Sequence, residues 1–456
     1  MLRVQPVLTY EIPKRREGAS WRQWGGLQTE AELNEEKARI GRDLAVIKAK
    51  GPASMEFLPL REAATVEQAK EVAQLGYDAA IIYGAGGNNR ILEAVTRPDR
   101  WNMIFIRHRS GPVYLWYEIV HPRYLRKTVD QYGQPGVTVE DIVIDEPGEI
   151  AWRLRALSGL KNTLGRRVLC IGGASGWGAG GRKAPQIARD LWKLDLVEFS
   201  IPQLGERMKT AYADSKMMRE AQLAAGKYLS SKQVKLEVPK ESVERAFVLT
   251  HVFRELMKET GSTAMTVNQC MGAIMGASQT TACLPLSVLN DEGYLAFCES
   301  DFVVIPSGIL LNGIAGVPVF LNDPTYPHHG LVTIAHCTAP RRLDGKTDAP
   351  VRILTHFESD FGASPKVEMR MGEKVTNIVP DFDAKKWVGF LGEVAGNPFM
   401  PICRSQVDIG LNCSDQRLAE EMRGFHWMTS YTDALKETGY AVKKLGIEWL
   451  DLTAKG

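Results

Sequence analysis

The chain has 456 residues, which is too long for one hydrophobic core and suggests about three domains. Its 44% apolar and 24% charged content is that of an ordinary globular protein and excludes extended disorder. The net charge of +2, from 56 basic and 54 acidic side chains, excludes a protein that mainly binds a nucleic-acid backbone or an anionic membrane.

Cysteine spacing and the N-terminal residues indicate the compartment. Seven cysteines are scattered without a C-x-x-C pair, so the sequence predicts neither a structural zinc site nor a dithiol redox site. Residues 1–18 hold no apolar run of signal-peptide length, and we expect a cytoplasmic protein. Residues 302–322 carry no charge, but prolines and glycines interrupt them, which favours a buried helix and strand over a membrane span.

The first 165 residues alternate helix and strand patterns. A long helix with a charged face is expected over 29–50, a helix over 65–76, and a buried strand over 77–84. Strands that alternate with helices are typical of a parallel, doubly wound sheet. We therefore predict an N-terminal α/β domain over residues 1–165.

A second unit of the same kind is predicted over residues 166–312. Residues 166–173 and 196–201 indicate strands, and 243–261 an amphipathic helix that ends at a glycine. Residues 261–290 have no charged side chain yet are rich in Thr, Ser, Asn and Gln. We interpret this stretch as buried backbone beside a site that recognises neutral hydroxyl groups.

The last region, residues 313–456, has short apolar runs separated by turn residues. This pattern is typical of an antiparallel sheet or barrel. The predicted fold class is thus α/β, with two doubly wound parallel-sheet domains followed by a mostly antiparallel, barrel-like C-terminal domain. A helix is expected over residues 431–446.

Two glycine-rich stretches, residues 84–89 and 171–181, each follow a predicted strand. Either can in principle cradle a phosphate at a helix N-terminus. Neither has the spacing of a dinucleotide-binding or phosphate-binding loop, so we interpret them as tight turns or substrate-facing loops.

A pair of acids flanks the charge-free stretch at 302–322. Glu299 and Asp323 lie 24 residues apart. If residues 303–314 are helical and 317–323 extended, the helix advances about 18 Å and the strand returns roughly 20 Å. An antiparallel course then places Asp323 beside Glu299, where the two carboxylates can share one cation.

Histidines downstream of this pair, His336, His356 and His426, are candidate partners. An imidazole with two carboxylates is a suitable ligand set for Mn²⁺ or another first-row divalent ion. Taken singly, each acid is more often a cap or an ion-pair partner, and each histidine more often a packed or exposed side chain.

The ordered motifs resemble the L-fucose isomerase and L-arabinose isomerase superfamily. They are WRQWGGL at 21–27, VNQCMG at 267–272, LNDEGYLAFCESD at 289–301, PVFLND at 318–323, FHW at 425–427 and YTDALKETGYAVKKLGIEWL at 431–450. The resemblance implies that Glu299 and Asp323 are both metal ligands and the proton-transferring pair, and that His426 is the third ligand. It also implies a Mn²⁺ (or Mg²⁺ or Co²⁺) cofactor and a homohexamer with active sites near subunit interfaces, where Trp21 and Trp24 are candidate contacts.

The expected activity is metal-dependent aldose–ketose isomerisation of a free sugar through an enediol. Asn268, Gln269 and Asn322 are candidate hydroxyl-binding residues, and His336 is a candidate substrate-binding residue. Arg341 and Arg342 are weaker candidates for an acidic group on the sugar. An epimerase or lyase acting on a sugar, a sugar acid or a sulfonated sugar remains open, as does an inactive sugar-binding relative. A nucleotide-dependent oxidoreductase is the least supported class.

Overall fold

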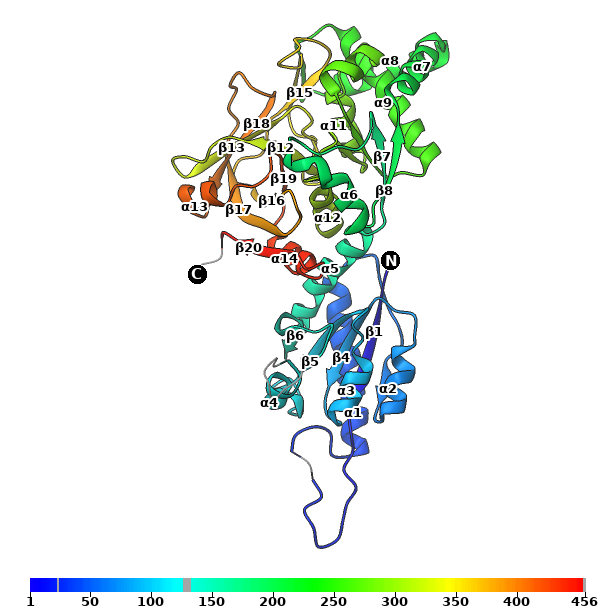
Figure 1. Cartoon of the computed structure of the whole chain (residues 1–456), viewed down its shortest axis with the longest axis vertical. Helices are drawn as coiled ribbons and strands as arrows, with labels where there is room; N and C mark the ends of the chain where they lie inside the picture. Colours follow the sequence, from blue (N-terminus) through cyan, green and yellow to red (C-terminus); the bar gives the residue numbers. More distant parts are fainter. Residues whose placement is uncertain (23, 126–132, 454–456) are drawn as a thin grey trace. The chain divides into compact units, whose positions relative to one another are not determined.

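The computed structural model of the chain describes residues 1–22, 24–125 and 133–453 (Figure 1). These residues form two compact units, Met1–Lys161 and Asn162–Gly456. The first boundary lies close to the predicted one at 165. The predicted boundary at 312 falls inside the second unit, and the division of that unit into two domains stays a prediction.

The first unit is a six-stranded parallel sheet with the order β2-β1-β4-β5-β6, in which β3 also pairs with β1. Its strands are β1 (Leu2–Thr9), β2 (Met55–Phe57), β3 (Arg61–Ala63), β4 (Ala79–Gly84), β5 (Trp101–Ile106) and β6 (Ile142–Ile144). Its helices are α1 (Glu30–Lys50), α2 (Val66–Ala73), α3 (Asn89–Val95), α4 (Trp116–Val120) and α5 (Pro147–Thr163), with short turns η1 (His121–Leu125) and η2 (Val139–Asp141).

Local sequence signals explain where the first helices begin. The side chain of Thr29 accepts a hydrogen bond from the backbone N–H of Glu32 and caps α1. Thr65 and Gln68 form a reciprocal capping box at the start of α2. Both helices therefore start within a residue of the predicted positions.

A buried ionic network joins α1 to the end of β5. Arg107, which is 1% exposed, donates from Nε to Glu36 Oε1 at 2.6 Å and from Nη2 to Asp43 Oδ2 at 2.5 Å. The hydroxyl of Tyr114 donates to the same Glu36 oxygen at 2.5 Å. Removing the Arg107 cation would leave the buried Glu36 carboxylate with only Arg39 and the Tyr114 hydroxyl, and would remove the guanidinium that donates to Asp43.

We expect Arg107→Met to lower the free energy of unfolding of the first unit by about 3–5 kcal/mol, the usual cost of breaking a buried ion pair on one side. Hydrogen exchange of the β4 and β5 amides in the full chain measures this loss. Arg3→Met is the matched control, because Arg3 and Glu56 form an exposed pair 3.6 Å apart, which contributes at most about 1 kcal/mol. Equal protection in both variants would contradict the prediction.

The second unit begins with a four-stranded parallel sheet of order β11-β10-β7-β8. Its strands are β7 (Arg167–Ile171), β8 (Asp195–Phe199), β10 (Ala264–Val267) and β11 (Leu295–Phe297). The helical segments of this region are η3 (Gly180–Lys183), α6 (Ala184–Asp190), α7 (Ile201–Ala213), α8 (Ser215–Leu229), α9 (Lys240–Thr260), η4 (Cys270–Ile274), α10 (Met275–Ser278) and α11 (Cys283–Asp291). Gly261 ends α9 with φ +65°, as its sequence position predicts.

The rest of the second unit is a closed antiparallel barrel of six strands. The order β16-β19-β12-β13-β18-β17 closes through the β16–β17 pairing, and β20 adds in parallel to β17. The strands are β12 (Val319–Pro324), β13 (Leu331–His336), β16 (Lys374–Val379), β17 (Lys386–Gly396), β18 (Ser405–Leu411), β19 (Trp427–Ser430) and β20 (Glu448–Asp451). Three helices accompany them: α12 (Ile305–Ala315), α13 (Asp415–Glu421) and α14 (Leu435–Lys443).

The predicted fold class is confirmed: parallel sheets with helices come first and the antiparallel barrel follows (Figure 1). One detail differs. Two of the expected barrel runs instead form β14 (Val351–Leu354) and β15 (Ser364–Val367), which build a separate three-stranded sheet with β9 (Val234–Leu236). Short apolar runs do not reveal their pairing partners, and that pairing is long-range here.

The charge-free stretch is the expected buried helix and strand. It forms α12, whose residues from Ile305 to Leu311 are buried, and then β12, which enters the barrel. Among the residues that the structure describes, no helix has the length and apolar character needed to cross a bilayer.

Candidate metal centre

A pocket of about 630 Å³ lies at the carboxyl ends of β7, β10 and β11. Ligand sites of parallel sheets form at this edge, because the loops that follow the strands meet there. The pocket is lined by Ser175, Gly176, Trp177, Gly178, Asn268, Gln269, Cys270, Met271, Gly272, Glu299, Asp323, Glu358, Cys403 and Phe425. The acids Glu299 and Asp323, predicted to meet, thus face one cavity.

The backbone that presents Glu299 is strained. Glu299 and Ser300 both adopt left-handed conformations, with φ +62° and +52°, and Gln269 on the neighbouring loop has φ +55°. Such conformations cost non-glycine residues about 1–3 kcal/mol each and cluster at functional sites. Ser300 is held in place by its backbone N–H, which donates to Thr266 Oγ1 at 3.1 Å, and by its hydroxyl, which donates to Gly173 O at 2.9 Å.

The two acids that line the pocket meet two buried histidines that are not part of its lining. His426 Nε2 lies 3.4 Å from Glu299 Oε2 and 3.2 Å from Asp323 Oδ1. His336 Nε2 lies 3.7 Å from Glu299 Oε1. The barrel sets this arrangement, because β12 pairs with both β13 and β19 and brings Asp323, His336 and the residue before β19 to one end.

The convergent atoms fit a cation. Asp323 Oδ1, His336 Nε2 and His426 Nε2 are buried and make no hydrogen bond, although they lie close together. Buried polar atoms are normally satisfied, and here their only partners are the ion pairs of 3.2 to 3.7 Å within the cluster, which a bound cation would replace. Glu299, His336 and His426 can each direct one ligand atom to a common ion, with these atoms within 4.8 Å of one another. Two imidazoles and a carboxylate suit a first-row divalent metal. Asp323, the other predicted ligand, is not part of this group, but its Oδ1 lies 3.2 Å from His426 Nε2.

Asp301 orients the central histidine. Its Oδ2 lies 2.7 Å from His426 Nδ1, and its Oδ1 accepts hydrogen bonds from the backbone N–H groups of Trp177 and Val303. With Nδ1–H donated to this carboxylate, the lone pair of His426 Nε2 faces the pocket. A carboxylate behind a ligating imidazole is the usual support of a metal site.

The glycine-rich loop after β7 forms a wall of the pocket. The indole N–H of Trp177 donates to Glu299 Oε2 at 2.6 Å, and its ring is stacked on Phe425 with centroids 4.0 Å apart. The backbone N–H of Phe302 donates to Ser175 O at 3.1 Å and ties the loop to the Glu299 segment. The loop thus lines the pocket, and its role as a substrate-facing loop stays a prediction.

The charges within the cluster perturb each other. Burial would raise the pKa of Glu299, but His336 and His426 hold it far below its ordinary value. The pKa of Asp323 is raised, because burial outweighs the same two imidazoles. Burial disfavours imidazolium, yet Glu299 and Asp323 raise the pKa of His336 to about 9. The carboxylates, with Asp301 foremost, raise the pKa of His426 to about 10.

Metal binding should therefore release protons. At neutral pH both imidazoles of the metal-free protein are charged, and a cation at their Nε2 atoms displaces about two protons. Calorimetric titration with Mn²⁺ in buffers of different ionisation enthalpy measures this number. The pKa values of His336 and His426 both exceed 6.5, the ordinary pKa of histidine. The two charged imidazoles therefore stabilise the metal-free fold fully below pH 6.5, and this stabilisation is lost as the pH rises through about 9 and 10. Metal binding at pH 7 without proton release would contradict the prediction.

Of the remaining predicted site residues, some line the pocket and others do not. Asn268 and Gln269 line the pocket, as expected. His336 does not line the pocket but belongs to the group that could hold a metal ion, with Nε2 3.7 Å from Glu299 Oε1, and its substrate-binding role stays a prediction. Asn322 does not line this pocket: it is fully buried and donates to Phe320 O and Thr429 Oγ1. Successive strand residues face opposite sides, so Asp323 in the pocket directs Asn322 away from it.

Arg341 and Arg342 are also outside this pocket. The Nε of Arg341 donates to Ala349 O, and that of Arg342 pairs with Asp348 at 2.6 Å. Sequence reasoning missed Asp301, Trp177, Glu358 and Cys403, which contact or line the site. The sequence could have indicated Asp301, because it follows Glu299 by two residues and ends the motif at 289–301.

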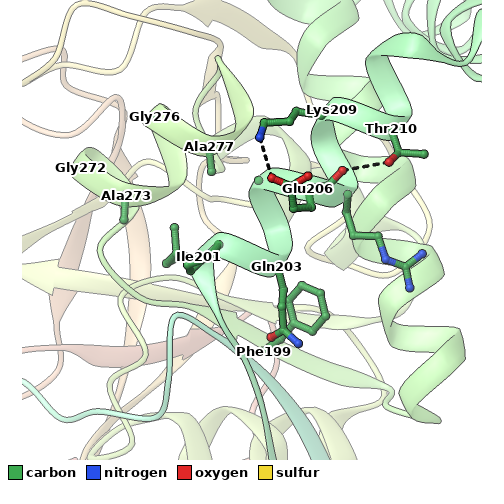
Figure 2. Close-up of a pocket in the computed structure, with 13 residues that line it drawn as sticks. Phe199, Ile201, Gln203, Glu206, Lys209, Thr210, Gly272, Ala273, Gly276 and Ala277 are labelled. Atoms are coloured by element: carbon green, nitrogen blue, oxygen red, sulfur yellow. Dashed lines mark hydrogen bonds and ion pairs between the residues drawn. The ribbon is translucent and has the colours of Figure 1, made fainter.

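A larger pocket, of about 820 Å³, lies between α7 and the segment of η4 and α10 (Figure 2). Small side chains and glycines form much of its wall, including Gly272, Ala273, Gly276 and Ala277. Its charged groups are neighbours on one helix: Lys209 pairs with Glu206, and Thr210 donates to the Glu206 carbonyl. These are ordinary contacts of an exposed helix face, so this pocket offers no convergent ligand atoms.

No model of a known protein family matches the chain, and no curated protein sequence is detectably similar to it.

Proposed function

We propose that the chain is a divalent-metal-dependent aldose–ketose isomerase that acts on a free sugar through an enediol, within the L-fucose and L-arabinose isomerase superfamily. The observation that carries the proposal is that Glu299 and Asp323 line one pocket and meet the buried side chains of His336 and His426, where Asp323 Oδ1 and both Nε2 atoms lack a hydrogen bond. Mn²⁺ is the proposed ion, because a mixed oxygen and nitrogen set without thiolate suits it.

The proposed ion would polarise the sugar carbonyl as a Lewis acid and so acidify the adjacent C–H bond. The protein's own part is proton transfer. Glu299 and Asp323 face the same pocket, and their surroundings move their pKa values in opposite directions. Such a pair suits a reaction in which one carboxylate accepts a proton and another group returns one. General acid–base help of this kind contributes about 10² to 10⁴ in rate.

The pocket favours a neutral substrate. Among its described lining residues none is Lys or Arg, while Glu299, Asp323 and Glu358 supply negative charge. Asn268 and Gln269 follow β10 and offer neutral amides for sugar hydroxyl groups. A phosphorylated or acidic sugar would find no Lys or Arg side chain there to pair with its anionic group. This supports a free aldose over a sugar acid or a sulfonated sugar.

The test is product analysis with Mn²⁺-supplied protein. Neutral aldoses and their acidic counterparts are incubated with it, and the products are identified by NMR. We expect ketose from a neutral aldose and none from the acidic counterparts. A cleaved or epimerised product would replace isomerisation by the lyase or epimerase alternative, and binding without any product would leave the sugar-binding relative.

We also propose a homo-oligomer, a hexamer, in which a neighbouring subunit covers the pocket. Large apolar side chains at the pocket remain open to solvent: Met271 is 51% exposed, Trp177 42% and Phe425 43%. Aromatic residues and Met are enriched at subunit interfaces. Sedimentation equilibrium tests this part, and a fully active monomer would contradict it.

A further inference from the structure

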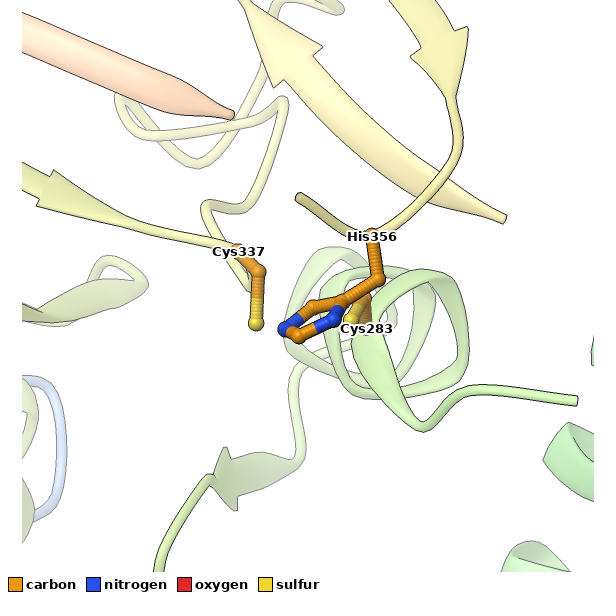
Figure 3. Close-up of side chains that lie close together, drawn as sticks. All are labelled: Cys283, Cys337 and His356. Atoms are coloured by element: carbon orange, nitrogen blue, oxygen red, sulfur yellow. The ribbon is translucent and has the colours of Figure 1, made fainter. Parts of the chain in front are cut away.

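A second cluster of ligand-type side chains lies outside the pocket. Cys283, Cys337 and His356 come from distant parts of the sequence and meet in the protein interior, where they are 4%, 2% and 4% exposed (Figure 3). One ligand atom from each lies within 4.8 Å of the others. In Figure 3 a ring nitrogen of His356 is directed toward the sulfur of Cys337, and the sulfur of Cys283 lies beside the ring.

Three separate elements supply these residues. Cys283 is the first residue of α11, Cys337 directly follows β13, and His356 follows β14. The end of β13 lies between two clusters: His336 contacts Glu299, and Cys337, the next residue, belongs to the interior group. The absence of a C-x-x-C pair predicted no structural zinc site, but the cysteines of this cluster are 54 residues apart in the sequence and meet only through the fold.

The contacts of His356 leave its ring in a fixed orientation. Its Nδ1 lies 3.0 Å from Ser359 Oγ, and its Nε2 lies 3.0 Å from Glu358 Oε2. The Glu358 side chain is 48% exposed, so the carboxylate can turn toward solvent when another partner takes the nitrogen. A hydroxyl behind the second ring nitrogen is the support that a ligating imidazole needs.

We propose that Cys283, Cys337 and His356 form a second metal site, which binds a thiophilic cation of the Zn²⁺ class. Two thiolates and an imidazole are soft ligands, unlike the carboxylates of the pocket, and they select Zn²⁺ over Mn²⁺ or Mg²⁺. Binding breaks two S–H bonds, forms two metal–sulfur bonds and releases both protons to solvent. The two thiolates then balance the dication, so the buried site carries no net charge.

Such an ion would tie three elements together beside the pocket. It would join the start of α11, the end of β13 and the loop after β14. Cys337 Sγ also lies 3.7 Å from Nδ1 of His336. A metal-bound Cys337 sulfur can accept the Nδ1–H of His336 and keep its Nε2 lone pair toward the pocket.

Co²⁺ is the probe for this site, because thiolate ligands give it an intense near-ultraviolet charge-transfer band that carboxylate and imidazole ligands do not. We expect the full chain to show this band with one equivalent of cobalt per subunit. Glu299→Gln, which impairs the pocket cluster alone, should keep the band. Cys283→Ser and Cys337→Ser should lose it, while Cys413→Ser, at a cysteine outside the cluster, should retain it.

A second pair of thiols has to be distinguished from this cluster. Cys270 and Cys298 lie within 4.8 Å of Glu299 and are the alternative source of a thiolate band. The band should persist in Cys298→Ser. In His356→Gln, which keeps all thiols, the affinity for cobalt that the band reports should fall at least tenfold. Absence of the band in the wild type at saturating cobalt, or a band lost in Cys298→Ser and kept in Cys283→Ser, would overturn the proposal.

Discussion

Glu299→Gln is expected to lower kcat by a factor of about 10² to 10⁴, the usual contribution of general acid–base catalysis. The amide cannot accept the substrate proton, and it removes the anionic oxygens that lie 3.4 Å from His426 Nε2 and 3.7 Å from His336 Nε2. Binding of Mn²⁺ should weaken in the same variant. Steady-state kinetics at saturating sugar and calorimetric titration of the metal measure the two effects.

The control for this variant is Glu237→Gln. Glu237 is also an ion-paired glutamate, but it pairs with Arg352 beside the small β9–β14 sheet. We expect it to keep wild-type turnover and metal affinity. A fully active Glu299→Gln enzyme would remove Glu299 from the chemistry.

Asp301→Asn is expected to weaken metal binding by about 10- to 100-fold, the usual effect of losing the carboxylate behind a ligating histidine. The asparagine oxygen can still accept from the Trp177 and Val303 amides, so the loop should keep its shape. What changes is the partner of His426 Nδ1, which lies 2.7 Å from the carboxylate. The affinity for Mn²⁺ is the first quantity to measure.

Rescue by metal separates this positioning role from a folding role. Excess Mn²⁺ should restore most of the kcat of Asp301→Asn, and the pH profile of metal binding should shift, because the pKa of His426 depends on Asp301. A variant that loses activity without regaining it at high Mn²⁺, and that keeps wild-type metal affinity, would contradict the assignment.

The convergence of Glu299 and Asp323 followed from local geometry. A helix and a returning strand of similar length close on themselves, and the structure has α12 and β12 within two residues of the expected positions. Both elements are defined by apolar pattern and by glycine and proline boundaries, which a single sequence displays. The fold class followed from the same patterns.

The rest depends on pairing that sequence patterns do not display. The contact of His336 with Glu299 requires β13 to lie beside β12 in the closed barrel, and the contact of Trp177 requires a glycine loop some 120 residues upstream of Glu299. Asn322 was a case in which more could be inferred. Once Asp323 faces the site, strand alternation turns its neighbour away.

Solvent deuterium exchange tests the central claim most directly. The metal-stripped protein and the Mn²⁺-supplied protein are each incubated with the same neutral aldose in D₂O, and deuterium at C2 of the recovered aldose is followed by NMR. We expect deuterium and ketose to appear together only with Mn²⁺, and both to vanish in Glu299→Gln. Ketose or deuterium formed at equal rates without metal, or a tightly bound metal with no exchange in any neutral aldose, would contradict the account.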